Sequence, residues 1–180
     1  QYCLKAEKET RVCQTAADCD CFAERLAAGC WTHGELAECL AREIAVQRLT
    51  DRTRRLMPPQ MPNPFVSRAH QQRMTSIAAA MNREPSPYTA AAFLLSADTV
   101  LWKKSCCALC GRAVDFGKID VRGISQDGYT LLQTAKDLYH GGCRITTEEL
   151  CDSGMISDSL FRLIISAFVI RRYGLFAGAY

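Results

Sequence analysis

The stretch 88-YTAAAFLL-95 decides the class of fold. Its residues are almost all apolar, so a helix formed by them leaves little polar surface to face solvent. A helix that is apolar all round belongs in the middle of a core. Pro85 and Pro87 stand just before it, where prolines end one helix and begin the next. We therefore expect a buried central helix with other helices packed around it.

Upstream of this helix, the chain carries its clearest boundary. Ser67 is placed to cap a helix that runs to about Asn82 with apolar residues on one face. Before it, the segment 57-MPPQMPNP-64 is rich in proline, which cannot continue a helix and favours an extended path. We expect an N-terminal part (1–57), a proline-rich linker (58–66) and a C-terminal helical domain (67–180).

The N-terminal part is predicted to be a helical hairpin. Apolar residues at helical spacing predict a first helix from Thr15 to Ala28, with Gly29 as its stop. Thr32, followed three residues later by Glu35, predicts a capping box for a second helix that runs to about Leu56. Because the turn between them is short, the two helices are expected to pack antiparallel.

Downstream of the central helix, the pattern predicts further helices and one irregular segment. A short helix begins at Ser96 or Asp98 and runs toward a cysteine cluster. Residues 111–128 are the least helical part, and the sequence fits a short β-hairpin and an ordered loop equally well there. Further helices are expected at 129–140, 146–154 and 157–173. The predicted class is all-α, with a short irregular or β-hairpin insertion.

The composition bounds the setting of the protein. The chain has 180 residues and a formal net charge of +3, which is too small to indicate nucleic acid by itself. Its 11 cysteines are odd in number, and several stand at apolar helix positions, as Cys39 does. A secreted disulfide framework would be denser and richer in loops. Reduced thiols and a cytoplasmic location are expected; because the chain begins at Gln1, a cleaved signal peptide and secretion stay the alternative.

A membrane location is not expected. The most apolar stretch, residues 155–170, is interrupted by Asp158 and Arg162. It also falls short of the roughly 20 residues that span a bilayer. The stretch is better explained as a buried helix.

Paired cysteine and histidine residues suggest a metal site. Cys107-x-x-Cys110 and His140-x-x-Cys143 together offer three thiolates and an imidazole, a ligand set that suits structural zinc. The alternative is that these are thiols spaced this way by chance, since cysteines are frequent throughout the chain. A second, weaker set is formed by Cys19, Cys21, Cys30 and His33.

Two groups of arginines are candidates for binding a partner. Arg48, Arg52 and Arg55 recur at i, i+4 and i+7, so one helical face would present them to phosphates or to an acidic protein surface. Arg171 and Arg172 end the last helix, where cations also suit the helix dipole. The alternative for the first group is a solvated face.

Catalytic signatures are missing from the sequence. It contains no Gly-x-Ser-x-Gly, His-Glu-x-x-His, Walker-type or dinucleotide-binding glycine pattern. None of its three histidines lies in a local signature that fixes a cysteine partner. We expect a protein that is not an enzyme, and a cysteine-dependent enzyme ranks third among the hypotheses.

Residues 64–173 resemble a family of small uncharacterised proteins of gut Firmicutes and their phages and conjugative elements. The resembling stretches are 88-YTAAAFLLSAD-98, 132-LQTAKDLYHG-141 and 150-LCDSGMISDSLFRLIISAFVIRRY-173. The family has no assigned reaction, and Cys107, Cys110 and Cys143 lie outside its pattern.

The resemblance implies a mobile-element setting. Small helical proteins without catalytic groups commonly act there by occupying a host protein, and inhibitors of CRISPR nucleases are typical examples. The expected function is non-catalytic binding to a host protein or a protein–nucleic-acid complex, such as a Cas nuclease. The alternative is a zinc-stabilised module that binds nucleic acid directly through the Arg48 stripe.

Overall fold

The computed structural model describes residues 21–78, 85–142 and 144–175. The chain divides into two compact units, and the change from unit 1 to unit 2 falls between Asn63 and Pro64, inside the proline-rich segment. The described parts of both units are helical, with one short two-stranded sheet in unit 2. The predicted all-α class with a β-hairpin insertion is therefore confirmed. Residues 15–20, at the start of the first predicted helix, lie outside the described residues.

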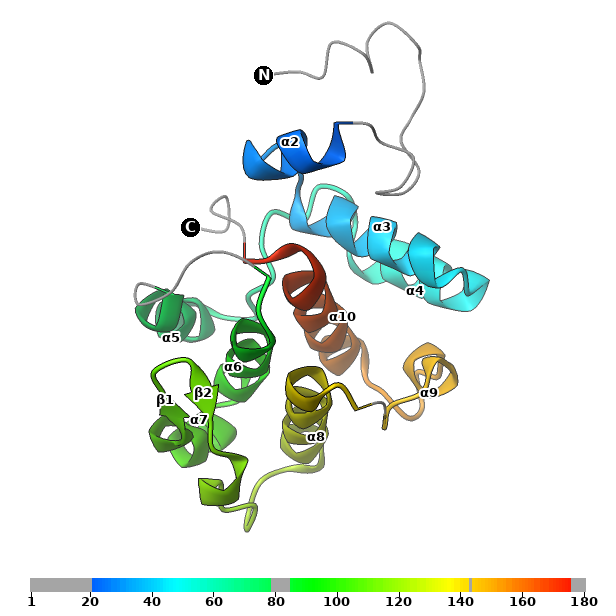
Figure 1. Cartoon of the computed structure of the whole chain (residues 1–180). Coiled ribbons are helices and arrows are strands. Elements are labelled where there is room, and N and C mark those ends of the chain that lie inside the picture. The colour runs from blue at the N-terminus through cyan, green and yellow to red at the C-terminus, as the bar shows by residue number, and fades with distance from the viewer. Residues whose placement is uncertain (1–20, 79–84, 143, 176–180) are drawn as a thin grey trace, which may run out of the picture. The chain divides into compact units, whose positions relative to one another are not determined.

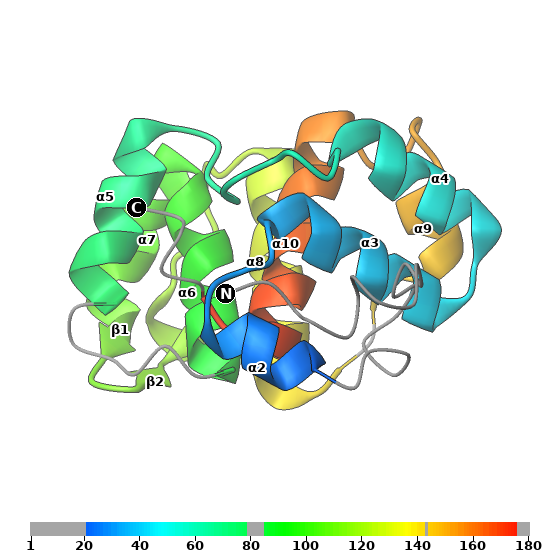
Figure 2. The ribbon, with the colours of Figure 1, turned by 90° about the horizontal axis from the view of Figure 1, so that it is seen from above.

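The centre of unit 2 is α6 (Pro87–Ala97), the helix predicted from its apolar sequence. Every residue from Tyr88 to Ser96 is buried. Figures 1 and 2 show α5 (Arg68–Ala78) and α7 (Thr99–Ser105) on one side of α6, with α8 (Gln126–His140) and α10 (Asp158–Tyr173) on the other. All four helices can pack on α6 because α6 is apolar on every face.

The predicted irregular segment contains both a β-hairpin and an ordered loop, the two alternatives left open by the sequence. After α7, the 3₁₀ turn η1 (Cys106–Ala108) leads into a hairpin of β1 (Leu109–Cys110) and β2 (Ala113–Val114). Gly111 lies in its turn with a φ of 62°, a left-handed conformation that favours glycine. The 3₁₀ turn η2 (Phe116–Lys118) and a loop then lead to α8. The hairpin thus begins two residues before the predicted segment.

The remaining helices of unit 2 begin at their predicted caps or a few residues earlier. Ser157 caps α10 by accepting a hydrogen bond from the backbone N–H of Leu160 at 3.3 Å. Thr146 caps α9 (Thr147–Cys151) in a capping box with Glu149. α8 begins at Gln126, capped by Ser125, three residues before the predicted start. Among the described helices, none is long and apolar enough to cross a membrane.

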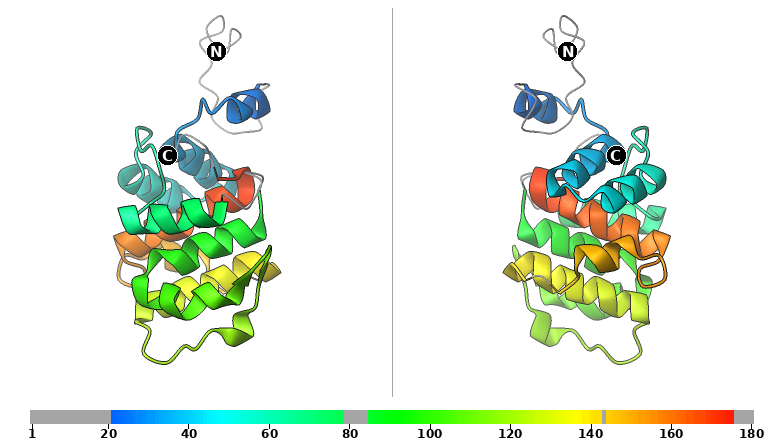
Figure 3. Two further views of the ribbon diagram at one scale, coloured as in Figure 1. Left: turned by 90° about the vertical axis from the view of Figure 1, so that its left-hand side faces the viewer. Right: turned by 90° about the vertical axis from the view of Figure 1, so that its right-hand side faces the viewer.

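In unit 1, the single helix predicted from Thr32 to Leu56 is wrong. Thr32 and Glu35 form the predicted capping box, but α3 (His33–Ile44) ends at Ala45, whose φ is 58°. α4 (Gln47–Leu56) then folds back, so α3 and α4 lie side by side in a helical hairpin (Figure 3), which is a different pair from the predicted helices 15–28 and 32–56. The short helix α2 (Phe22–Ala27) precedes this hairpin.

The break has a physical cause in the apolar pattern. In one continuous helix, Leu49 would stand about 220° around the axis from Leu36, almost on the opposite face. Both side chains are nevertheless fully buried. By turning back between them the chain buries both, although the stripe changes phase after Ile44, which is itself exposed.

The first half of the predicted linker packs on α3. Gly34 donates from its backbone N–H to Met61 O at 3.2 Å, and the Thr32 hydroxyl donates to the carbonyl of Pro59. A Cβ at Gly34 would lie 1.9 Å from Pro58 O, so this close approach requires glycine. Residues 58–61 are thus a structural part of unit 1.

Candidate functional site

The predicted zinc ligands lie at the end of unit 2 that carries the hairpin. Cys107 and Cys110 are exposed in η1 and β1, and His140 is exposed at the end of α8. Cys143 lies outside the described residues. Within the described ranges, no three Cys, His, Asp or Glu side chains are grouped to hold a metal ion. The zinc site therefore stays a prediction.

Aromatic contacts hold the hairpin end of unit 2 against α8. The ring centroid of Phe116 lies 5.5 Å from those of both Tyr139 and His140. The hydroxyl of Tyr139 accepts a hydrogen bond from the backbone N–H of Val114 at 3.4 Å. The His140 imidazole is therefore packed against aromatic rings, and the side chains that join α8 to the hairpin here are aromatic.

The second cysteine set is divided by burial. His33 is buried, and desolvation lowers its pKa to about 4, so it is neutral at pH 7. Cys21 and Cys30 are half-buried, and Cys19 lies outside the described residues. A proton-accepting role of His33 toward solvent is not supported by this burial.

His70 is a core residue. Its side chain is fully buried, and its Nε2 lies 3.0 Å from Phe93 O, while Val66 N lies 3.5 Å from Nδ1. Burial lowers its pKa to about 4, although the bond to Phe93 acts in the opposite direction. The neutral imidazole can donate to Phe93 through Nε2 and accept from Val66 through Nδ1.

The predicted stripe on α4 does not present its three arginines to solvent. Arg48 and Arg55 are exposed, but Arg52 is only 5% exposed, so the expectation of a solvated Arg52 is wrong. Beside the stripe, Arg54 contacts Glu38 at 2.8 Å, which also pairs with Arg42 at 2.6 Å. The open cationic face of α4 is therefore smaller than the spacing predicts.

The arginines at the end of α10 are accessible. Arg171 and Arg172 are both exposed in its last turn. Their positions agree with an interaction of cations with the helix C-terminus. Their part in binding a partner stays a prediction.

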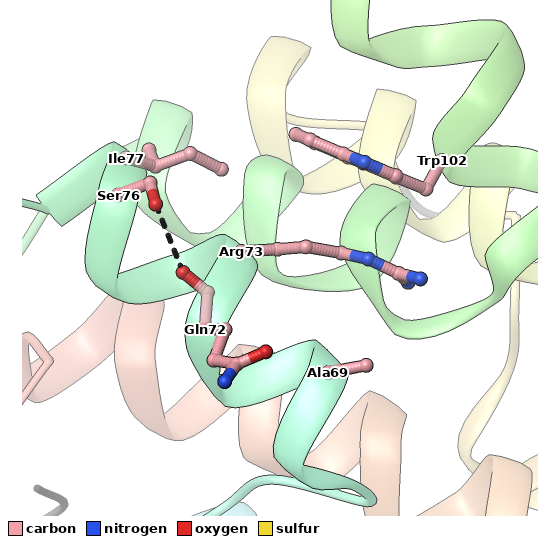
Figure 4. A pocket seen from close by; sticks show the side chains of 6 residues that line it. All are labelled: Ala69, Gln72, Arg73, Ser76, Ile77 and Trp102. Carbon is pink, nitrogen blue, oxygen red and sulfur yellow. Dashed lines mark hydrogen bonds between the residues drawn. The ribbon is translucent and has the colours of Figure 1, made fainter.

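Unit 2 also has a surface hollow that the sequence did not indicate, which we call the α5–α7 groove. Its volume is about 400 Å³, and it is open to solvent. One face of α5 and a single side chain of α7 line it (Figure 4): Ala69, Gln72, Arg73, Ser76, Ile77 and Trp102.

Arg73 and Trp102 form the polar and aromatic centre of this groove. Figure 4 shows the two side chains extended one beside the other, and the guanidinium carbon lies 5.9 Å from the centroid of the Trp102 ring. Arg73 donates to Ser96 O at 2.8 Å and to Thr99 Oγ1 at 3.2 Å. These bonds fix the arginine where α6 ends and α7 begins.

The groove is bordered by positive charge. Neither α5 nor α7 contains an aspartate or glutamate, and between them they carry four cationic residues: Arg68, Arg73, Lys103 and Lys104. Arg68 and Lys103 are exposed, and Lys104 lies 3.7 Å from Asp120. The four cations outnumber Asp120 and Asp98, the N-cap of α7, so the potential over this part of unit 2 is expected to be positive.

Sequence reasoning missed the groove because its two walls are separated in the chain. The residues of α5 that line it recur at i, i+3, i+4, i+7 and i+8, which is a signal of one helix face. The sequence pattern places Ile77 on the apolar face of the helix capped by Ser67, and Trp102 in the short helix that begins at Ser96 or Asp98. Trp102 is half-exposed, and Ile77 faces the groove.

Comparisons with known proteins give no relative for this chain: no family model, no curated protein and no solved structure matches it.

Proposed function

We propose that this chain is a non-catalytic binding protein whose α5–α7 groove receives an acidic segment of a partner protein. The observation that carries the proposal is the half-exposed Trp102 beside Arg73 in a surface hollow. Tryptophan and arginine are the side chains that most often dominate the energy of protein interfaces. Arg73 is also held in place before binding, which lowers the entropy cost of forming the interface.

Charge indicates the chemistry of the partner. The four cations of α5 and α7 outnumber the neighbouring carboxylates of Asp98 and Asp120, so they attract an acidic surface and repel a basic one. Ala69, Ile77 and the indole ring add apolar area for an anchoring side chain. A partner segment with an apolar residue flanked by carboxylates fits both features.

The length of the groove and its single aromatic ring favour a short peptide segment over nucleic acid. From Ala69 to Ile77 the lining face of α5 is about 12 Å long, which accommodates two helical turns of a partner. Single-stranded nucleic acids are usually bound by several stacked aromatic rings along a longer groove.

The shifted pKa values of buried Cys39, His33 and His70 support a role without catalysis. His33 and His70 are buried and neutral. Burial raises the pKa of the Cys39 thiol to about 11, so its nucleophilic thiolate is scarce at pH 7. His33, His70 and Cys39 are buried in the fold, and none of them lines the α5–α7 groove.

In a cell, the proposed role is counter-defence, which is inhibition of a host nuclease complex by binding. A mobile-element protein that binds a host nuclease complex in the cytoplasm would need an accessible anchoring surface and no reaction. The resemblance of residues 64–173 to proteins of phages and conjugative elements is the reason for this assignment, and the groove supplies a surface that suits it.

Peptide selection tests the proposal without knowledge of the natural partner. A random peptide library is selected on the full chain and counter-selected on Trp102→Ala, with folding of the variant checked by circular dichroism. We expect enrichment of acidic residues beside an apolar anchor. Ser76→Glu adds a carboxylate to the groove and should weaken binding of the same peptides at least several-fold.

Two results would contradict the proposal. One is a set of selected peptides that bind Trp102→Ala as tightly as the parent protein. The other is Trp102-dependent retention of a random oligonucleotide pool in a parallel selection that enriches no acidic peptide.

A further inference from the structure

Cys106 and Cys107 form a pair of accessible thiols at the end of α7. Their Sγ atoms lie 4.0 Å apart. Cys107 is exposed and Cys106 is half-buried. Both are free thiols, and the Cys106 Sγ also donates to Lys103 O at 3.7 Å. The pair is therefore open to a reagent that contacts both sulfurs at once.

The backbone on both sides of the pair is fixed. Ser105 is fully buried and donates to Trp102 O at 3.4 Å. Ala108 is also buried, and its carbonyl accepts a hydrogen bond from Asp115 N at 2.9 Å. Because these neighbours hold η1 in place, the two thiols are already close together before a ligand arrives.

A disulfide between these adjacent residues is disfavoured. Their peptide bond is trans, which sets the Cα atoms about 3.8 Å apart, whereas disulfides usually need roughly 4.4–6.8 Å. The sulfurs would also have to approach from 4.0 Å to about 2.05 Å. An atom that bridges two sulfurs avoids the direct S–S bond and this backbone demand.

We propose that Cys106 and Cys107 form a dithiol site for a trivalent thiophilic metalloid, of which an organic arsenical is the chemical model. In the binding step, an arsenic oxide R–As=O reacts with two thiols to give R–As(S–Cys)₂ and one water. Two As–S bonds replace the As=O bond, both thiol protons leave in the water, and no electron is transferred. Soft thiolate sulfur is the protein ligand that such a centre prefers.

Cys110 stands apart from this pair. Its Sγ donates to Cys107 O at 3.6 Å, and within the described part of the chain no three cysteine or histidine side chains group as ligands. The site is therefore assigned two thiols. This assignment shares Cys107 with the predicted zinc set, so one chain cannot use Cys107 in both ways at once, and it does not rest on the α5–α7 groove.

Differential alkylation after binding of phenylarsine oxide tests the assignment. The full chain is treated with the arsenical, and its remaining thiols are alkylated with a light reagent. An excess of a small dithiol then removes the arsenic, and a heavy reagent alkylates the released thiols. Trypsin cleavage after Lys104 and Arg112 yields the peptide 105-SCCALCGR-112, which contains these three cysteines and no others.

We expect the heavy label on Cys106 and Cys107 and the light label on Cys110. Buried Cys39 reports on unfolding: the heavy label should be absent from it, and light alkylation there would reveal partly unfolded protein. In Cys106→Ser, protection of Cys107 should be lost, whereas Cys110→Ser should keep the parent pattern. Heavy label on Cys107 and Cys110 of the parent protein, or continued protection of Cys107 in Cys106→Ser, would overturn the proposal.

Discussion

The imidazole of His70 shows how burial, the largest of several influences, lowers the pKa of one residue. The sequence places His70 four residues before Met74, on the apolar face of the predicted helix, but it does not identify what covers that face. In the structure it is fully buried beside Phe93, and its pKa is lowered to about 4. Because this burial depends on α6, which lies far along the chain, residue spacing near His70 could not predict it.

The lowered pKa makes stability depend on pH. The unfolded state takes up a proton near pH 6.5, whereas the folded state does so only near pH 4. The contribution of the neutral imidazole is therefore complete above pH 6.5 and is lost as the pH falls to about 4, by roughly 3 kcal/mol at most. His33 is expected to add a loss of the same sign in unit 1.

Chemical denaturation at several pH values between 7 and 4 measures this effect. In His70→Gln, the free energy of unfolding should fall less steeply with decreasing pH than in the parent protein. Equal slopes for His70→Gln and the parent would contradict the interpretation of His70 as a buried neutral base.

At the scale of elements, Ala45 is the residue at which local pattern and structure disagree. Neither glycine nor proline marks the break between α3 and α4, so the pattern predicts one helix. The caps at Thr32, Thr146 and Ser157 could be predicted because their partners lie three residues away. The break was missed because the burial of both Leu36 and Leu49 is known only from the structure, whereas the phase change between them can be calculated from the sequence.

The left-handed conformation of Ala45 predicts a stabilising substitution. Its Cβ disfavours a φ of 58°, so Ala45→Gly should raise the free energy of unfolding by about 1 kcal/mol. Ala28→Gly is the control, because exposed Ala28 has a right-handed conformation and glycine there should destabilise. Thermal melts of the two variants check the signs, and destabilisation by Ala45→Gly would contradict the assigned turn.

Measurements of unfolding free energy can also distinguish the buried arginine of α4 from an exposed one. Arg52 is buried, so Arg52→Ala should destabilise the protein by about 2 kcal/mol or more through lost packing and lost interactions. Arg48→Ala removes an exposed side chain and should change stability by less than about 0.5 kcal/mol. Similar losses in denaturation midpoints for the two variants would contradict the difference in burial.

At the scale of the whole molecule, the sequence predicted the class of fold but not the candidate site. The apolar stretch of α6 implies surrounding helices, and the prolines near residue 60 mark the change between units. The α5–α7 groove arises because α5 and α7 both pack on α6 and leave a hollow between Arg73 and Trp102. Such a site depends on tertiary packing, which the sequence does not reveal. The arginine spacing on α4 therefore predicted a different binding surface.

The central claim, binding through the α5–α7 groove, is tested most directly by the fluorescence of Trp102. The chain has two tryptophans, so Trp31→Phe leaves Trp102 as the single reporter. When a selected acidic peptide is titrated, the emission of Trp102 should shift with the Kd measured by calorimetry. Both signals should weaken as salt is raised. A peptide that binds by calorimetry while Trp102 emission stays unchanged would contradict the account.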